Sequence, residues 1–162
     1  MTRWIVDASP LIFLAKLDRL DLLRRSATEV LLPAAVLEEV RRLPDEASAR
    51  VEEAFGSWLR MGNAGDRSTV EVLDLDLGPG EAEAIVLARE MRADRIVLDD
   101  QDARRFARRL GLVPIGTLGI LLAARLRGEI QEIRGEIDRL QAQGFRASQE
   151  LLDAVLREAG EG

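Results

Sequence analysis

The side chains of this sequence whose types and positions could support chemistry are carboxylates. Asp7 directly follows the apolar run of residues 4–6, and Asp99 and Asp100 directly follow the apolar run of residues 96–98. Ligands of parallel α/β sheets bind outside the carboxyl ends of the strands. If both runs are strands of such a sheet, they bring acidic side chains to one edge. Either aspartate alone fits ordinary turn chemistry, but the two strand ends together favour a site.

Two glutamates are expected on helices near the same edge. Glu39 flanks the apolar stripe of the helix that Pro33 opens, and a surface position is its equally simple interpretation. Glu81 begins the helix expected over residues 81–91 and shares its sheet-facing side. A carboxylate in the first turn of a helix is stabilised by about 0.3–1 kcal/mol through the helix dipole alone, which is a sufficient structural reason for Glu81. Glu83 falls between faces and is a second-tier candidate.

Four or five carboxylates in one pocket raise each other's pKa unless a counter-charge is present. A divalent cation supplies that charge, and a site with only oxygen ligands favours Mg²⁺ or Mn²⁺, which keep several waters and accept substrate phosphate. Two such ions about 3.5–4 Å apart activate a water and stabilise the leaving oxygen of a phosphodiester. The sequence leaves open whether one ion or two bind.

Composition excludes most other reaction types. The 162 residues include no histidine, cysteine or tyrosine, and Lys16 is the only lysine. Ser-His-Asp and Cys-His catalysis, thiolate or imidazole zinc sites, disulfides and lysine Schiff bases are therefore excluded. The net charge of −6 argues against sequence-blind nucleic-acid binding through overall charge. No secretion signal and no membrane span are evident, so we expect a cytoplasmic protein.

The elements that must position these acids alternate short β-branched runs with longer helical stretches, which predicts an α/β fold with a parallel sheet covered on both faces. Ser9 is expected to cap the first helix, with Pro10 at its first position. Residues 62–68 are expected to form a loop between the helix containing Trp58 and the third strand. The predicted strands are residues 4–6, 30–32, 70–73, 95–98 and 113–115.

The strands end before the last forty residues. Apolar residues at helical spacing, a stop at Gly144 and a cap at Ser148 predict a C-terminal helical hairpin. We therefore divide the chain into a core over residues 1–123 and a helical extension over residues 124–162. The narrow apolar stripes of the extension must pack against the core or against a partner chain.

These acids lie in motifs that resemble those of the PIN-domain nucleases, and most closely the prokaryotic branch related to VapC-like toxins. The resemblance runs in order through nearly the whole chain. The matching segments are Val6-Asp7-Ala8-Ser9-Pro10-Leu11-Ile12, Pro33-Ala34-Ala35-Val36-Leu37-Glu38-Glu39-Val40, Leu77-Gly78-Pro79-Gly80-Glu81-Ala82-Glu83-Ala84-Ile85, Val97-Leu98-Asp99-Asp100-Gln101-Asp102-Ala103-Arg104 and Ile115-Gly116-Thr117-Leu118-Gly119.

The resemblance implies a PIN-like three-layer α/β/α sandwich with a central five-stranded parallel sheet. It also implies a Mg²⁺- or Mn²⁺-dependent endoribonuclease, the toxin of a toxin-antitoxin pair, with a cognate antitoxin protein and a homodimeric state as expected partners. The implied acidic quartet, carried over motif by motif, is Asp7, Glu39, Glu81 and Asp100. The third acid is commonly aspartate in toxins, whereas this chain has a glutamate.

The fourth acid has two candidates, because Asp99, Asp100 and Asp102 crowd one turn. Asp99 is therefore kept as a possible metal ligand beside Asp100, and Asp102 as a supporting residue. Ser9 and Thr117 match positions where the family places hydroxyl groups near the metal site. We interpret both hydroxyls as supporting rather than catalytic.

An arginine-rich helix is expected beside these aspartates. Arg104, Arg105 and Arg108 are candidate RNA-binding residues, and Arg104 and Arg108 share one face of the helix. A solvated helix surface explains them equally well. No aromatic residue is interleaved with them, so base stacking of the kind used by single-strand binders is not evident.

Three competing interpretations remain. A dinucleotide cradle at residues 78–80 is weak, because Glu81 would repel a pyrophosphate at the helix start. A phosphoaspartate enzyme or receiver domain would also place an aspartate after the first strand, but it needs a late lysine that this chain lacks. The non-enzymatic alternative is a catalytically silent PIN-like binding module, which only a cleavage assay separates from a nuclease.

Overall fold

The computed structural model describes residues 1–43 and 45–162. The described residues form a five-stranded, all-parallel sheet with the strand order β3-β2-β1-β4-β5. The strands are β1 (Arg3–Val6), β2 (Glu29–Leu32), β3 (Leu59–Met61), β4 (Arg95–Val97) and β5 (Pro114–Ile115). The predicted parallel α/β fold is thereby confirmed.

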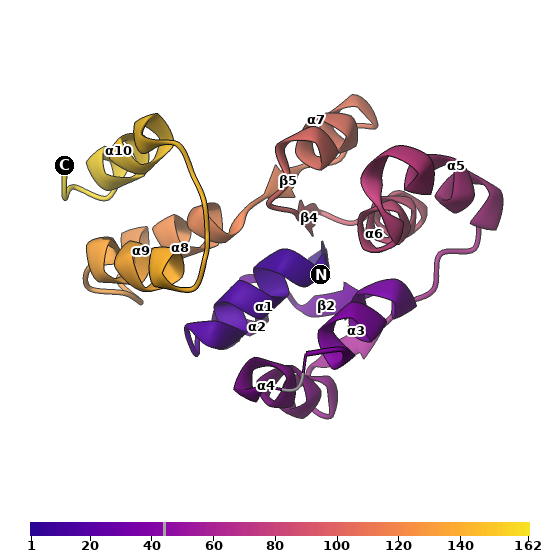
Figure 1. Cartoon of the computed structure of the whole chain (residues 1–162), viewed down its shortest axis with the longest axis horizontal. Helices are drawn as coiled ribbons and strands as arrows, with labels where there is room; N and C mark the ends of the chain where they lie inside the picture. Colours follow the sequence, from indigo (N-terminus) through magenta and orange to yellow (C-terminus); the bar gives the residue numbers. More distant parts are fainter. Residues whose placement is uncertain (44) are drawn as a thin grey trace.

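Helices cover both faces of the sheet, which gives three layers (Figure 1). One face carries α1 (Ala8–Lys16), α2 (Asp21–Ser26), α3 (Ala34–Arg41), α4 (Glu46–Phe55), α8 (Thr117–Leu126), α9 (Ile133–Ala142) and α10 (Gln149–Glu158). The other face carries α5 (Arg67–Leu77), α6 (Pro79–Glu90) and α7 (Gln101–Arg109).

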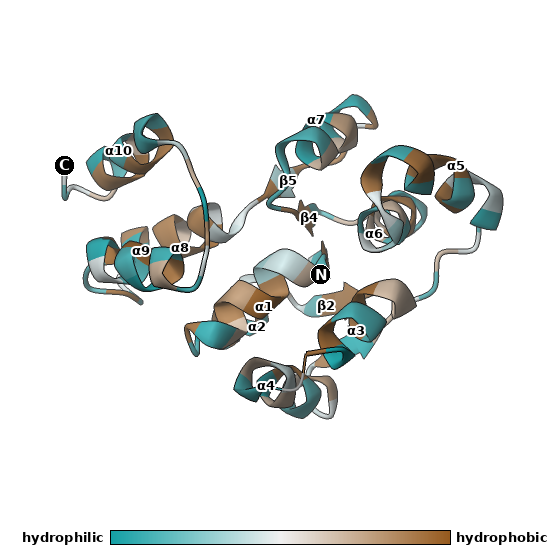
Figure 2. Ribbon diagram, in the orientation of Figure 1, coloured by the Kyte–Doolittle hydropathy of each residue, from teal (hydrophilic) through white to brown (hydrophobic). Residues whose placement is uncertain are grey.

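Alternation along the strands separates two hydrophobic cores. Trp4 and Val6 of β1 belong to the larger core, whereas Ile5 between them belongs to the smaller core under α5, α6 and α7. Successive side chains of a strand point to opposite faces, so an uninterrupted apolar run fits a sheet buried on both sides. Figure 2 shows that helices such as α5 and α10 have one hydrophobic and one hydrophilic side.

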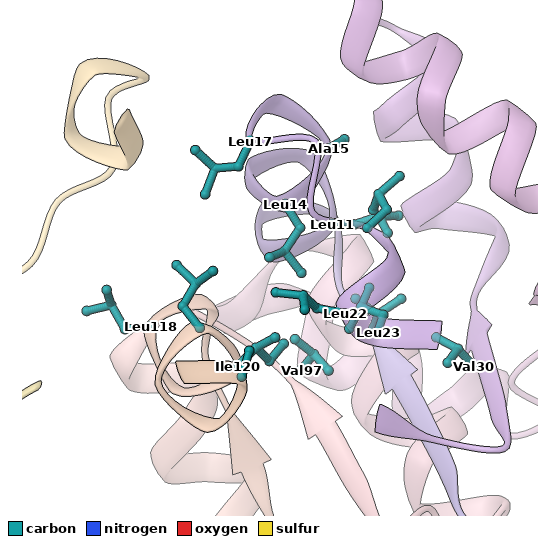
Figure 3. Packing of buried hydrophobic residues seen from close by; sticks show 14 of the residues in the cluster. Leu11, Leu14, Ala15, Leu17, Leu22, Leu23, Val30, Val97, Leu118 and Ile120 are labelled. Atoms are coloured by element: carbon teal, nitrogen blue, oxygen red, sulfur yellow. The ribbon is translucent and has the colours of Figure 1, made fainter. Parts of the chain in front are cut away.

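The larger core lies where the first helices meet α8. Figure 3 shows Leu14 of α1, Leu22 and Leu23 of α2, and Ile120 of α8 gathered beside Val97 of β4. Each of these residues has at most 2% of its surface exposed. The close packing of these side chains holds the carboxyl ends of β1 and β4 in place, and Asp7 and Asp99 follow these ends.

Four of the five predicted strands are confirmed, as β1, β2, β4 and β5, but the third was wrong. Residues 70–73 lie in the helix α5 and not in a strand. Asp66 caps this helix, because its carboxylate accepts hydrogen bonds from the Thr69 N–H at 3.1 Å and from Thr69 Oγ1 at 2.6 Å. The third strand is Leu59–Met61, so the loop after it joins β3 to α5 and ends at Asp66.

The predicted cap of the first helix was also wrong by two residues. α1 begins at Ala8, and its N-cap is Asp7, so that Ser9 and Pro10 lie inside the first turn. The cause is that β1 passes directly into α1. The Asp7 N–H still donates a sheet hydrogen bond to the Val97 carbonyl at 3.0 Å, which leaves no linker in which Ser9 could act as the cap.

The C-terminal extension packs onto the core. Ile133, Ile137 and Leu140 of α9 and Leu152 of α10 belong to the same hydrophobic cluster as α1. The helix α8 spans the boundary proposed after residue 123 without a break. In the described part of the chain, no helix is long and apolar enough to cross a membrane.

Candidate functional site

One cavity opens at the carboxyl edge of the sheet, where the ends of β1 and β4 meet the start of α6 and Glu39 of α3. Its volume is about 570 Å³. It is lined by Asp7, Ser9, Phe13, Glu39, Leu77, Gly78, Pro79, Gly80, Glu81, Asp99, Asp100, Gly144, Phe145 and Arg146. The chain topology therefore brings together the four predicted acids, the alternative acid Asp99 and the hydroxyl of Ser9. Their roles stay predictions.

Asp7 is the most deeply placed acid of the cavity, with 6% of its surface exposed. Burial raises the pKa of the Asp7 carboxyl to about 7, while the Ala8 N–H lowers it and the charges of Glu39, Asp99 and Asp100 raise it further. A buried carboxylate surrounded by other carboxylates is a group whose ionised form needs a cation.

Glu81 lies in the first turn of α6, just after Gly78, whose φ of +95° turns the chain from α5 into α6. Burial raises the pKa of the Glu81 carboxyl to about 8, and the charges of Asp7, Asp100 and Glu39 act in the same direction. The helix dipole that explains a glutamate at this position would favour its ionised form. Burial, together with the neighbouring acids, acts on the Glu81 carboxyl in the opposite direction.

Gly80 lies close to both Asp7 and Glu39. A Cβ at Gly80 would lie 3.3 Å from Asp7 Oδ1, 3.5 Å from Val36 Cγ2 and 3.7 Å from Glu39 Oε1. The two carboxylate oxygens therefore lie within a few ångströms of one point beside a backbone that has no side chain. Glu39 itself is exposed, so it reaches the cavity from the solvent side.

Asp99 and Asp100 follow β4 but have different partners. Asp99 accepts hydrogen bonds from the Thr117 N–H and from Thr117 Oγ1, each at 2.7 Å. Asp100 is the N-cap of α7, and one of its oxygens, Oδ2, accepts a hydrogen bond from the Ala103 N–H at 2.9 Å. The charge of Asp100 raises the pKa values of both Asp7 and Glu81, and the charge of Asp99 raises the pKa of Asp7. Both oxygens of Asp99 accept hydrogen bonds from Thr117, whereas the bond to Asp100 uses Oδ2, so Asp100 is the better candidate for the fourth acid of the quartet.

Burial also raises the pKa of Asp99, while the two hydrogen bonds from Thr117 and the charge of Arg104 lower it. Thr117 is fully buried and lies at the start of α8. The predicted supporting residue Thr117 thus holds Asp99, and does not itself line the cavity.

Two predicted supporting acids lie outside the cavity. Glu83 is 9% exposed, and its Oε2 lies 3.5 Å from Arg67 Nη2 between α5 and α6. The difference from Glu81 is one of helix geometry, since residues two apart on a helix do not share a face. Asp102 is exposed and forms an ion pair with Arg105.

The three candidate RNA-binding arginines separate in the structure. Arg104 and Arg108 line a second cleft next to the cavity, whereas Arg105 is exposed and paired with Asp102. Burial and the neighbouring Arg108 lower the pKa of the Arg104 guanidinium, and Asp99 partly offsets them.

Sequence reasoning missed Arg146 and Gly80. Arg146 lies in the segment between α9 and α10, which packs back over the site through an edge-on contact of Phe145 with Phe13, their ring centroids 5.2 Å apart. No local pattern signals this contact. The signal for Gly80 was present, because a glycine one residue before a helical acid at a converging edge indicates close approach.

The donors of the cavity fit a hydrated divalent ion. Among residues 1–43 and 45–162, no three acidic side chains lie in the arrangement of a preformed metal cage. Mg²⁺ is commonly held by one or two carboxylates, with waters and substrate phosphates filling its other positions. An open cavity with carboxylate oxygens from Asp7, Glu39, Glu81 and Asp100 meets this requirement, and its buried acids need the positive charge.

Comparison with known families agrees with this architecture. Residues 3–161 match the DUF3368 family, which is described as a PIN domain. No curated protein matched the chain.

Proposed function

The chain belongs to the PIN-domain family, and from this premise we propose that it is a divalent-metal-dependent endoribonuclease. Members of this family are generally nucleases that typically use divalent metals. The observation that carries the proposal is the convergence of four carboxylates on one open cavity at the carboxyl edge of the sheet.

The residues of the cavity divide the work of phosphodiester hydrolysis. Asp7, Glu39, Glu81 and Asp100 would hold the cation, Mg²⁺ or Mn²⁺, by their carboxylate oxygens. A bound divalent ion supplies charge neutralisation at the phosphate and lowers the pKa of a bound water. Glu81, which lines the cavity with Asp7, would accept a proton from the attacking water once the bound cation keeps its carboxylate ionised.

The remaining polar groups position these acids. Asp99, fixed by its two bonds from Thr117, holds the end of β4 against the start of α8 and so sets the direction in which Asp100 leaves the strand. Ser9, in the first turn of α1, offers a hydroxyl beside Asp7. This proposal needs neither Asp99 nor Ser9 as a metal ligand.

Cleavage of unpaired and hairpin RNA in Mn²⁺ or Mg²⁺ tests the proposal. We expect the wild-type chain to cut RNA only with a divalent ion present, and Asp7→Asn to lower the rate by more than about 100-fold. If the wild-type chain binds metal and RNA but cuts neither substrate, the protein is instead a catalytically silent PIN-like binding module.

The proposal extends to the cellular role. The resemblance to VapC-like toxins supports a toxin that is neutralised by a cognate antitoxin protein and acts as a homodimer in the cytoplasm. Expression of the wild-type chain should stop bacterial growth, whereas Asp7→Asn should not. Light scattering in solution should give the mass of two chains. Unimpaired growth on expression of an active nuclease would contradict the toxin role while leaving the nuclease intact.

A further inference from the structure

A second cleft, of about 440 Å³, adjoins the acidic cavity. Asp99, Phe145 and Arg146 line both spaces, so the segment before α10 forms a wall shared between them. The cleft lies between α7, the start of α8 and the beginning of α10. In Figure 1, α7 lies above β5, and α8 and α10 lie to its left. An RNA strand bound in the acidic cavity would therefore extend into this cleft.

The cleft carries charge of the opposite sign. Three guanidinium groups line it, from Arg104, Arg108 and Arg146, against the single carboxylate of Asp99. Among the residues that the structure describes, none of these three arginines forms an ion pair with a carboxylate. Their neighbour Arg105, one position along α7 from Arg104, is paired with Asp102. Unpaired cations thus collect on the side of α7 that faces the cleft.

Arg104 is held in a partly buried position that the backbone makes possible. A Cβ at Gly116 would lie 2.5 Å from Arg104 Nη1 and 3.0 Å from Asp99 Oδ1. Any larger residue at position 116 would push the guanidinium away. Partial burial of an unpaired guanidinium beside another arginine is unfavourable unless an anion completes the arrangement.

The other walls of the cleft are apolar. They come from Pro114, Ile115, Leu118, Phe145, Leu151 and Val155. Leu151 is 43% exposed, although it is a large hydrophobic side chain. Guanidinium groups beside apolar walls match a nucleotide, whose phosphate binds arginine and whose base face packs on apolar and aromatic side chains. A base whose face packs on these walls is not at the same time stacked and paired within a duplex.

We propose that Arg104, Arg108 and Arg146 form a subsite that binds an unpaired nucleotide of the RNA strand next to the bond being cut. This inference rests on the proposed nuclease function and adds the side chains that bind the RNA strand beside the cleavage point. Arg146, which borders both spaces, holds the phosphate nearest to the acidic cavity. The C-terminal extension thereby contributes to substrate binding.

Binding is measured with the full chain carrying Asp7→Asn, using fluorescence anisotropy of an end-labelled unpaired RNA in Mg²⁺, with intact RNA confirmed on a gel. Arg108→Ala and Arg146→Ala in this background should each weaken binding about tenfold. Each should also lower the slope of log Kd against log salt by about 1. Arg105→Ala is the matched control, because it removes an arginine of the same helix that lies outside the cleft, and it should change neither quantity.

A second variant addresses the geometry without removing a charge. Gly116→Ala should weaken binding of unpaired RNA by displacing the Arg104 guanidinium, and circular dichroism checks that the variant is folded. A fully paired hairpin should bind more weakly than unpaired RNA to the Asp7→Asn parent. Equal losses for Arg105→Ala and Arg146→Ala, or tighter binding of an acidic peptide than of RNA, would overturn the subsite.

Turnover separates this inference from the proposed function. In the chain with an intact acidic cavity, Arg108→Ala and Arg146→Ala should raise KM for a long unpaired RNA with little change in kcat. A wild-type chain that cuts RNA with an unchanged KM in both variants would reject the subsite alone. A wild-type chain that cuts nothing, while the binding pattern above holds, would reject the nuclease and leave an RNA-binding cleft.

Discussion

Thr117 holds Asp99 with both of its donors, the backbone N–H and Oγ1, each at 2.7 Å. This pair joins the carboxyl end of β4 to the first residue of α8, on the edge of the sheet where the acidic cavity opens. Because the side chain of Asp99 is occupied in this way, Asp100 is the more available acid of the two.

Thr117→Val tests this positioning role, since valine keeps the shape of threonine and the backbone bond but removes the hydroxyl donor. We expect the free energy of unfolding to fall by about 1–3 kcal/mol, because a buried carboxylate oxygen loses its partner. The loss of that bond also raises the pKa of Asp99 further. Urea unfolding measures the first effect, and unchanged stability would show that Oγ1 does not support Asp99.

Gly80→Ala should separate metal affinity from stability. Alanine is favoured over glycine in a helix by up to about 1 kcal/mol, so folding should be retained or slightly improved. The added methyl group would lie 3.3 Å from Asp7 Oδ1 and would crowd the space between Asp7 and Glu39. Mn²⁺ affinity, measured by calorimetry, should therefore fall by about tenfold or more.

The matched control for Gly80→Ala is Gly135→Ala in α9. A Cβ at Gly135 meets no atom within 4 Å, so the substitution should stabilise the helix without affecting metal binding. Equal Mn²⁺ affinity in the two variants would contradict the close approach of the acids at Gly80.

The stability of the metal-free protein should decrease as the pH rises. The folded protein binds a proton on Asp7 more tightly than the unfolded chain does, with a pKa of about 7 against 3.8. Between these two values the folded state holds more protons, so the free energy of unfolding falls with pH by roughly 2–4 kcal/mol. Glu81 extends the decrease toward pH 8.

Thermal melts in EDTA from pH 5 to pH 8.5, followed by addition of Mg²⁺ at the upper end, measure this decrease. Mg²⁺ should restore much of the lost stability, because the cation binds the ionised carboxylates. In Asp7→Asn the decrease should be smaller and the effect of Mg²⁺ weaker. A metal-free protein that becomes more stable between pH 5 and pH 8 would contradict the arrangement of the acids.

The sequence allowed much of the fold to be predicted, because β1, β2, β4 and β5 lie in strongly apolar runs. β3 was missed since it has three residues, and its last two are exposed. Residues 70–73 alternate like a strand, but the capping of α5 by Asp66 and the packing of Val70 against α6 decide the helix. Tertiary packing overrode the local β propensity in this segment.

The acids of the cavity were predictable by position, because parallel topology brings strand ends and helix starts to one edge. The contribution of Arg146 was not, since it depends on Phe145 packing against Phe13, more than a hundred residues earlier in the chain. The position of Glu83 could not be predicted from spacing alone, because its ion-pair partner Arg67 belongs to α5, and the sequence did not predict that helix.

The most direct test of the central claim compares Glu81→Gln with Glu83→Gln in RNA cleavage with Mn²⁺. The two substitutions make the same chemical change two residues apart on α6, but only Glu81 lines the acidic cavity. We predict that Glu81→Gln lowers the initial rate by more than about 100-fold and that Glu83→Gln cuts at nearly the wild-type rate. Equal rates for Glu81→Gln and the wild-type chain would contradict the account.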